Sequence, residues 1–164
     1  MQFDKTISGR IVTPLKVIDN GCIGIKSGKI AKVDKIKNFS LSINHHDFGN
    51  SFIFPGVIDG QTHAGSYLGF KGIESTSRSA ICGGITTIVD MPYDNPSPIT
   101  NIDLLREKIR AIKEFAFCDI ALYGTVLPGE GISKVGRMID SGIAAIKVAS
   151  IENHPTRFPR IPLN

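Results

Sequence analysis

The sequence has no tryptophan, only three cysteines and no long apolar run, and these shortages exclude several classes of protein. Cys22, Cys82 and Cys118 are odd in number and form no CxxC pair, so we expect reduced thiols rather than a disulfide framework. No apolar run approaches the roughly 20 residues of a membrane span. The start of the chain lacks the basic and apolar regions of a signal peptide, which predicts a soluble, cytoplasmic protein without a membrane partner.

The sequence also lacks a large excess of charge of either sign. The 19 basic and 15 acidic residues leave a net charge of +4, and only 7% of residues are aromatic. The basic residues are scattered among apolar ones, with no arginine-rich run, which argues against a nucleic-acid partner. Those between Arg106 and Lys113, Lys108 included, are interpreted as the solvated face of a helix.

What is present indicates a globular α/β protein of about one domain, because 164 residues fall within the usual domain size. Residues 1–51 alternate apolar and polar positions between Asn-Gly and Ser-Gly pairs, a pattern typical of β-hairpins. We therefore predict a small N-terminal β unit over 1–51. The polar stretch from Lys37 to Asn50 is interpreted as a hairpin tip or a linker.

After Ser51, apolar runs alternate with amphipathic segments, which predicts βα units and a parallel sheet over 52–164. The expected strands are 52–59, 85–90, 119–126 and 143–149, and the expected helices are 73–82, 102–116 and 133–140. A closed (β/α)8 barrel takes roughly 250 residues, and the 113 residues after Ser51 are about half of that. The region is therefore either an open four-stranded sheet or the first half of a barrel.

Side chains with metal-binding chemistry follow the first of these strands. Alternation places Asp59, Gln61 and His63 on one side of the chain at the strand's carboxyl end, where α/β sheets bind ligands. This makes a candidate metal corner, although a histidine after a strand is often only a hydrogen-bonded structural residue. Lys147 lies in the apolar run of the fourth strand, so it is either paired, neutral or modified, or it faces solvent on an edge strand.

Together these segments resemble the cyclic amidohydrolases, the family of allantoinase, dihydroorotase, hydantoinase and dihydropyrimidinase. The resemblance rests on Phe54–His63, on Gly83–Pro92 and on Gly142–Lys147, in that order along the chain. It implies the N-terminal half of a (β/α)8 TIM-type barrel, truncated after four βα steps and preceded by a segment of a small β-sandwich. It also implies a divalent metal centre, with zinc as the usual metal and up to two ions in a complete chain.

By the same resemblance, Lys147 is the lysine that CO2 carboxylates to give a metal ligand, and His63 and Gln61 are the other metal ligands. The implied reaction is hydrolysis of the C–N bond of a cyclic amide or ureide, such as an allantoin-, hydantoin- or dihydropyrimidine-like substrate. The segment Met91–Pro98 resembles a substrate loop, so Tyr93 and Asn95 are candidate substrate-binding residues. Turn chemistry alone also accounts for Asn95.

Three departures from the family pattern limit the site. Gln61 replaces the first histidine of a His-x-His pair, and an amide binds zinc weakly. Gly65 stands where dihydroorotases carry a substrate-binding arginine, which disfavours dihydroorotate. The remaining histidine ligands and the general base of the family are expected beyond residue 164, so no catalytic base is assigned.

Three interpretations therefore remain open. The chain is part of a longer metal-dependent hydrolase, a catalytically incompetent fragment or pseudoenzyme of that family, or an open α/β binding module. A homo-oligomer is possible in each case, because half a barrel exposes sheet edges. The loop His154–Arg157 either lines the mouth of the site or is solvated, and His45 and His46 are interpreted as surface residues.

Overall fold

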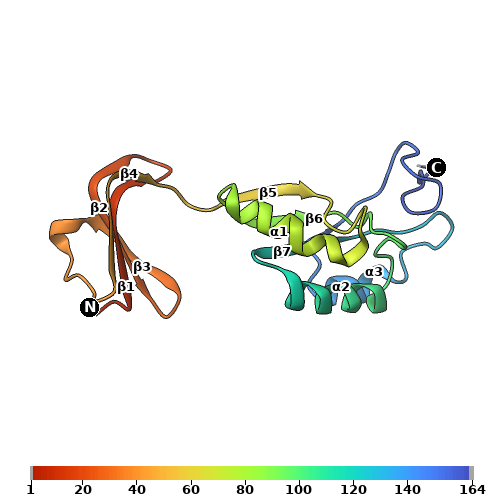
Figure 1. Cartoon of the computed structure of the whole chain (residues 1–164). Helices are drawn as coiled ribbons and strands as arrows, with labels where there is room; N and C mark the ends of the chain where they lie inside the picture. The colour runs from red at the N-terminus through yellow and green to blue at the C-terminus, as the bar shows by residue number, and fades with distance from the viewer. Residues whose placement is uncertain (1, 163–164) are drawn as a thin grey trace. The chain divides into compact units, whose positions relative to one another are not determined.

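The computed structural model describes residues 2–162, which form two compact units divided after Pro55. The first unit is a four-stranded sheet of order β3-β2-β1-β4 (Figure 1). Its elements are β1 (Lys5–Val12), β2 (Val17–Lys26), β3 (Lys29–Lys35), the short 3-10 helix η1 (Ile36–Asn38) and β4 (His45–Ile53). Strands β1, β2 and β3 are antiparallel neighbours, which confirms the predicted hairpins, whereas β4 runs parallel to β1.

The Asn20-Gly21 and Ser27-Gly28 pairs of this unit have different roles. Ser27 and Gly28 both have positive φ, and they form the tight turn between β2 and β3. The segment around Asn20 was expected to be a turn, but it lies inside β2. There the pairing with β1 shifts between Gly9 and Ile11, so the residues next to Asn20 make a bulge within one strand.

Part of the polar stretch Lys37–Asn50 belongs to strand β4, so its interpretation as a hairpin tip or linker was wrong for residues 45–50. This edge strand is mostly exposed, so it needs no apolar alternation to pair with β1. His45 is not a free surface residue, because its ring nitrogens lie 2.9 Å from Thr6 Oγ1 and 3.2 Å from Ser8 Oγ. His46 is exposed, as expected.

The second unit alternates strands and helices, and its four parallel strands follow the order of the sequence, β5-β6-β7-β8. Its elements are β5 (Val57–Thr62), η2 (Gly69–Lys71), α1 (Gly72–Cys82), β6 (Ile85–Asp90), α2 (Ile102–Phe115), β7 (Asp119–Gly124), α3 (Val135–Asp140) and β8 (Ala145–Ile146). The sheet is the half-barrel that the βα pattern and the family resemblance predicted (Figure 1).

Three strands of this sheet differ in their bounds from the prediction, among them β7, which ends at Gly124 instead of residue 126. Phe52 and Ile53 pair with β1 as the end of β4, so the first barrel strand begins only at Val57. The fourth strand is Ala145–Ile146 instead of 143–149, which leaves Lys147 just beyond its carboxyl end. Helix α2 begins at Ile102, as predicted, and the side chain of Asn101 caps it by accepting hydrogen bonds from the amides of Asp103 and Leu104.

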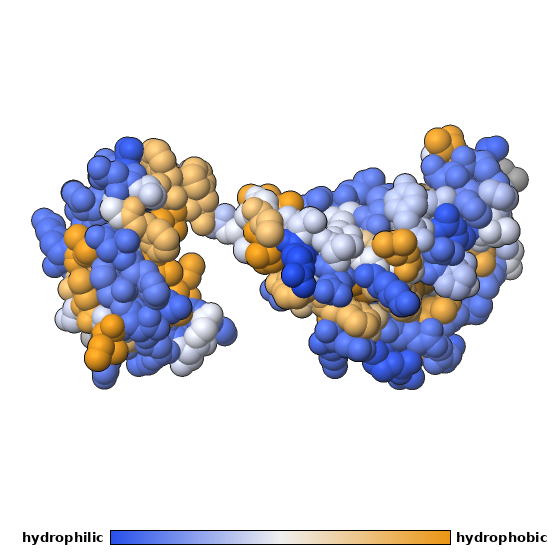
Figure 2. Space-filling view, in the orientation of Figure 1, coloured by the Kyte–Doolittle hydropathy of each residue, from blue (hydrophilic) through white to orange (hydrophobic). Residues whose placement is uncertain are grey.

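The core of the second unit lies between the sheet and its helices. Apolar side chains from α2, β7, α3 and the loop before α2 form its main cluster, which contains Ile99, Ile102, Leu105, Leu122 and Met138. Apolar surface remains exposed on both units (Figure 2), and on β5 it includes Val57 and Ile58, which are 54% and 66% exposed. Within residues 2–162, none of the helices has the length and apolar character needed to cross a bilayer.

Candidate active site at the strand ends

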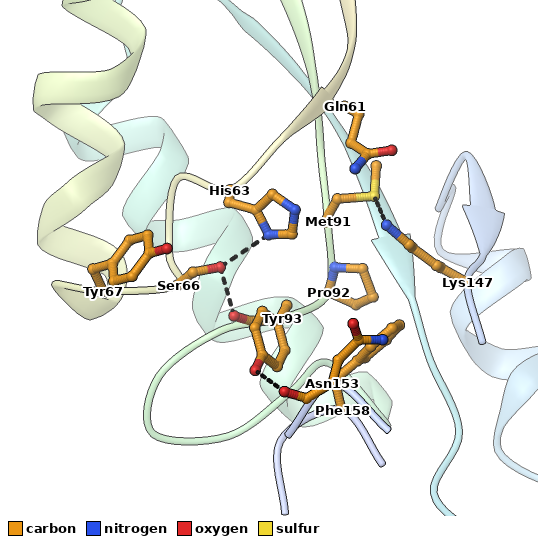
Figure 3. Close-up of a pocket in the computed structure, with 10 residues that line it drawn as sticks. All are labelled: Gln61, His63, Ser66, Tyr67, Met91, Pro92, Tyr93, Lys147, Asn153 and Phe158. Atoms are coloured by element: carbon orange, nitrogen blue, oxygen red, sulfur yellow. Dashed lines mark hydrogen bonds between the residues drawn. The ribbon is translucent and has the colours of Figure 1, made fainter. Parts of the chain in front are cut away.

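The carboxyl ends of the parallel strands carry most of the residues singled out in the sequence. His63 directly follows β5, Met91 follows β6 and Lys147 follows β8. Because neighbouring parallel strands end at the same edge of a sheet, these side chains meet at one side of the half-barrel. There they line a pocket of about 350 Å³ (Figure 3), together with Gln61, Ser66, Tyr67, Pro92, Tyr93, Asn153 and Phe158.

The imidazole of His63 is held on one side only. Its Nδ1 lies 3.1 Å from the hydroxyl oxygen of Ser66, and its ring meets Tyr93 edge-on at 6.1 Å between centroids. Partial burial is the main cause that lowers the pKa of His63 below its ordinary value, and the nearby ammonium of Lys147 lowers it further. The ring is therefore neutral at pH 7, which is the state in which histidine binds a metal.

Lys147 reaches into an apolar part of the pocket. Its Nζ lies 3.3 Å from Sδ of Met91 and 5.9 Å from the centroid of the Phe158 ring. Its backbone amide donates to the carbonyl of Gly124, which fixes the residue at the end of β8. β8 is an edge strand of the described sheet, but the side chain of Lys147 is half-buried and faces the same pocket as His63 instead of open solvent.

The other predicted residues divide into two groups. Gln61 and Tyr93 line the pocket, and Figure 3 shows the side chains of Gln61, His63 and Lys147 arranged around Met91. Asn95 does not line it: its side-chain amide donates to the carbonyl of Tyr67 at 3.3 Å, and the residue is exposed. This contact accounts for Asn95 in this conformation, and its role in substrate binding stays a prediction.

The loop after Lys147 closes one side of the pocket. Asn153 and Phe158 line it, and the ring of Phe158 packs against Tyr93 at 5.4 Å between centroids. His154 is a neighbour of Tyr93 at 6.1 Å, but its Nδ1 accepts the backbone amide of Arg157 inside the loop's own turn. The segment is therefore part of the pocket's border, and not only a solvated loop.

A buried ionic cluster beneath the pocket escaped the sequence analysis. Lys108 is fully buried, and its Nζ lies 2.8 Å from a carboxylate oxygen of Asp90 and 2.7 Å from one of Asp94. The interpretation of Lys108 as a solvated residue was wrong, because it continues the buried stripe of α2 between Leu105 and Ala111. The signal was available: Lys108 is three residues from Leu105 on the apolar face of the predicted helix.

This cluster ties the elements that support the pocket. Asp90 ends β6 and accepts the amide of Ala64, the residue next to His63, at 2.7 Å. Asp94 and the carbonyl of Met91, both in the loop after β6, receive hydrogen bonds from Lys108. Burial raises the pKa of Asp94 to about 6, even though Lys108 acts in the opposite direction. The cluster carries one more carboxylate than ammonium, and Asp94 is the member whose raised pKa lets it take up a proton as the pH falls below about 6.

Gly65 sits where any side chain would collide with this cluster. A Cβ built on Gly65 would overlap Oδ1 of Asp94, so the loop can follow this path only with glycine. The arginine that dihydroorotases carry at this place is therefore incompatible with the packing around Asp94.

The pocket offers an incomplete set of metal donors. His63 supplies one imidazole, Gln61 one amide, and Lys147 becomes an oxygen ligand only after carboxylation. Among the described residues, no three His, Cys, Asp or Glu side chains converge, and none of the pocket-lining ones is a carboxylate. These donors fit one divalent metal held by few ligands, and they do not fit a tightly bound binuclear centre.

Several curated proteins are similar in sequence to this chain over most of its length. No family model matches the chain. It is 30% identical to an allantoinase from Arabidopsis thaliana over 160 residues, which cover 93% of this chain and 31% of the relative. It is 32% identical to an L-hydantoinase from Paenarthrobacter aurescens over 143 residues, 84% of this chain and 30% of the relative. The chain thus spans about a third of the length of the curated relatives it matches.

Solved structures agree with the sequence matches. The L-hydantoinase (dihydropyrimidinase) from Arthrobacter aurescens superposes with a TM-score of 0.86 at 30% identity, over 98% of this chain and 36% of that one. A D-hydantoinase superposes with a TM-score of 0.70 at 23% identity, which supports the fold alone. The half-barrel, the strand-end motifs and these matches agree, and together they show that the chain is similar to about a third, the N-terminal portion, of cyclic amidohydrolases named allantoinase and L-hydantoinase.

Proposed function

We propose that this chain is the N-terminal part of a metal-dependent hydrolase that opens the C–N bond of a cyclic amide or ureide. The single observation that supports this most is the meeting of Gln61, His63 and Lys147 in one pocket at the carboxyl ends of the strands. Relatives named allantoinase and L-hydantoinase favour an allantoin- or hydantoin-like ring over other cyclic amides. The packing of Gly65 against Asp94 disfavours dihydroorotate.

In this proposal the residues of the chain hold the metal and shape the substrate pocket. His63 binds through Nε2, Lys147 binds through a carbamate oxygen once carboxylated, and Gln61 contributes a weak amide ligand. Zinc is the metal we propose, since an imidazole and oxygen donors suit it. When bound, the metal polarises the ring carbonyl and lowers the pKa of a water molecule.

The apolar surroundings of Lys147 support its proposed carboxylation. Only the neutral amine reacts with CO2, and the contacts with Met91 and Phe158 give the ammonium no carboxylate partner in the pocket. Tyr93 lies across the pocket, bordering His63 with its ring, and we propose that it packs against the flat substrate ring.

A chimera tests the proposed function. This chain replaces the matching third of the Arthrobacter aurescens L-hydantoinase, once with Gln61 and once with Gln61→His, and ring opening of hydantoin and allantoin is measured with zinc supplied. We expect the chimera to show turnover. His63→Ala and Lys147→Ala should each abolish this turnover. The matched controls His46→Ala and Lys113→Ala alter an exposed histidine and an exposed lysine, and they should leave turnover unchanged.

Two results would contradict the proposal. Turnover that survives Lys147→Ala would remove the lysine from the metal site. A folded chimera without turnover, with either Gln61 or Gln61→His, would favour the incompetent-fragment or pseudoenzyme interpretation instead.

A further inference from the structure

Ser66 is one of the most constrained side chains at the pocket. It is only 4% exposed, although it lies in the loop that follows β5. Its hydroxyl donates to the carbonyl of Tyr93 at 2.7 Å, and its own carbonyl accepts from Nη1 of Arg157 at the same distance. The guanidinium of Arg157 also lies 4.8 Å from the centroid of the Tyr93 ring. Both ends of Ser66 are thus fixed by other segments of the chain.

The direction of these hydrogen bonds decides the state of His63. A serine hydroxyl has a single proton, and the Tyr93 carbonyl can only accept one. Since the Ser66 proton is given to Tyr93, its oxygen acts as the acceptor toward Nδ1 of His63, 3.1 Å away. Nδ1 must therefore carry the ring proton, and Nε2 keeps its lone pair.

We infer that Ser66 is a positioning residue that holds His63 in the Nδ1–H tautomer and so presents the Nε2 lone pair to the pocket. Histidines that bind metals generally donate their second ring nitrogen to a fixed acceptor, which sets both the tautomer and the ring orientation. Here the acceptor is a neutral hydroxyl that depends on the loop after β6 for its own orientation. The idea that this contact serves metal binding rests on the proposed function. The contact itself is independent of the proposed function.

The inference is tested first without metal. The chain is labelled with 15N-histidine, and long-range 1H–15N correlations are recorded at pH 8, where the rings are neutral. The His63 signals are identified by their loss in His63→Ala among the four histidines of the sequence. We expect a protonated Nδ1 and an unprotonated Nε2 in the wild type. Ser66→Ala should shift His63 toward the Nε2–H form, and Ser66→Thr, which keeps the hydroxyl, should restore Nδ1–H.

Ser40→Ala is the matched control, because Ser40 is an exposed serine of the first unit and is not among the residues that line the pocket. It should leave the tautomer of His63 unchanged. Circular dichroism verifies that each variant is folded. An Nε2–H tautomer in the wild type, or a tautomer that Ser66→Ala does not alter, would overturn the inference whatever the metal does.

Zinc titration of the same variants then separates the inference from the proposed function. We expect Ser66→Ala to weaken zinc binding roughly 10- to 100-fold, as loss of an outer-shell partner usually does, with recovery in Ser66→Thr. If Ser66→Ala changes the tautomer while His63→Ala leaves the zinc affinity unchanged, the contact stands and the proposed metal role of His63 is overturned.

Discussion

Replacing Lys108 by methionine should destabilise the second unit more than any other single change on α2. The substitution keeps the length of the side chain but removes the charge between Asp90 and Asp94, whose oxygens lie 2.8 and 2.7 Å from Nζ. At an effective dielectric constant of about 20, each of these contacts corresponds to about 6 kcal/mol of Coulomb attraction, which the cost of desolvation largely offsets. Removing one partner of a buried pair leaves an unpaired charge and typically costs about 3–5 kcal/mol.

That loss is a large part of the roughly 5–15 kcal/mol that stabilise an ordinary domain. It should be smaller near pH 5 than at pH 7.5, because Asp94, whose pKa is raised to about 6, can then take up a proton. Urea unfolding at 25 °C followed by far-UV circular dichroism measures the change in the free energy of unfolding. The chain has no tryptophan, so fluorescence is a poor probe.

Lys113→Met on the same helix is the matched control, because Lys113 is exposed. Its effect should stay within about 0.5 kcal/mol. Adding Asp94→Asn to Lys108→Met should recover part of the loss, since it removes one of the two uncompensated charges. If Lys108→Met is within 1 kcal/mol of Lys113→Met, then Lys108 is not buried between the two carboxylates and the reasoning fails.

Three further outcomes are expected. The pKa of Asp94 is raised to about 6, so between pH 6 and 3.8 the folded state binds more protons than the unfolded state. The wild type should therefore gain stability relative to Asp94→Asn as the pH falls from 7 to 5, by up to about 1.4 kcal/mol per pH unit. Parallel pH profiles of the two proteins would contradict this. Asn101→Ala should cost about 1 kcal/mol in urea unfolding, because two amides of α2 lose their cap, and a loss below about 0.3 kcal/mol would show that the cap is dispensable. The 164-residue chain should self-associate through its exposed sheet edges, and light scattering that shows a monomer at all concentrations would contradict this.

The half-barrel was predictable because its signals are local. Apolar runs that end in Gly-Gly or in a polar cluster mark buried strands, and the helical spacing from Ile102 to Ala116 marks α2 within one residue of its observed end. Parallel order then follows from the βα alternation, which places the residues after β5 and β8 at one edge. His63 and Lys147 could therefore be assigned to one site from sequence.

What the sequence could not show depends on partners distant along the chain. β4 contains few alternating apolar residues, and only its backbone pairing with β1 makes it a strand. The position of Lys108 on the apolar face of α2 was visible in the sequence, but the two carboxylates that pair with it lie 14 and 18 residues before it in the chain, and that pairing was not. Ser66 gave no signal at all, since a serine three residues after a histidine is common in turns and its role depends on the Tyr93 carbonyl.

The zinc affinity of Gln61→His in the 164-residue chain tests the central claim most directly, because it asks whether positions 61 and 63 face one metal site. The wild type, with few donors, should bind zinc loosely. An imidazole at position 61 should tighten binding by at least about tenfold, since the loss of even an outer-shell partner costs that much, and His63→Ala in the same background should reverse the gain. A Gln61→His variant that is folded and binds zinc no more tightly than the wild type would contradict the metal site proposed at these strand ends.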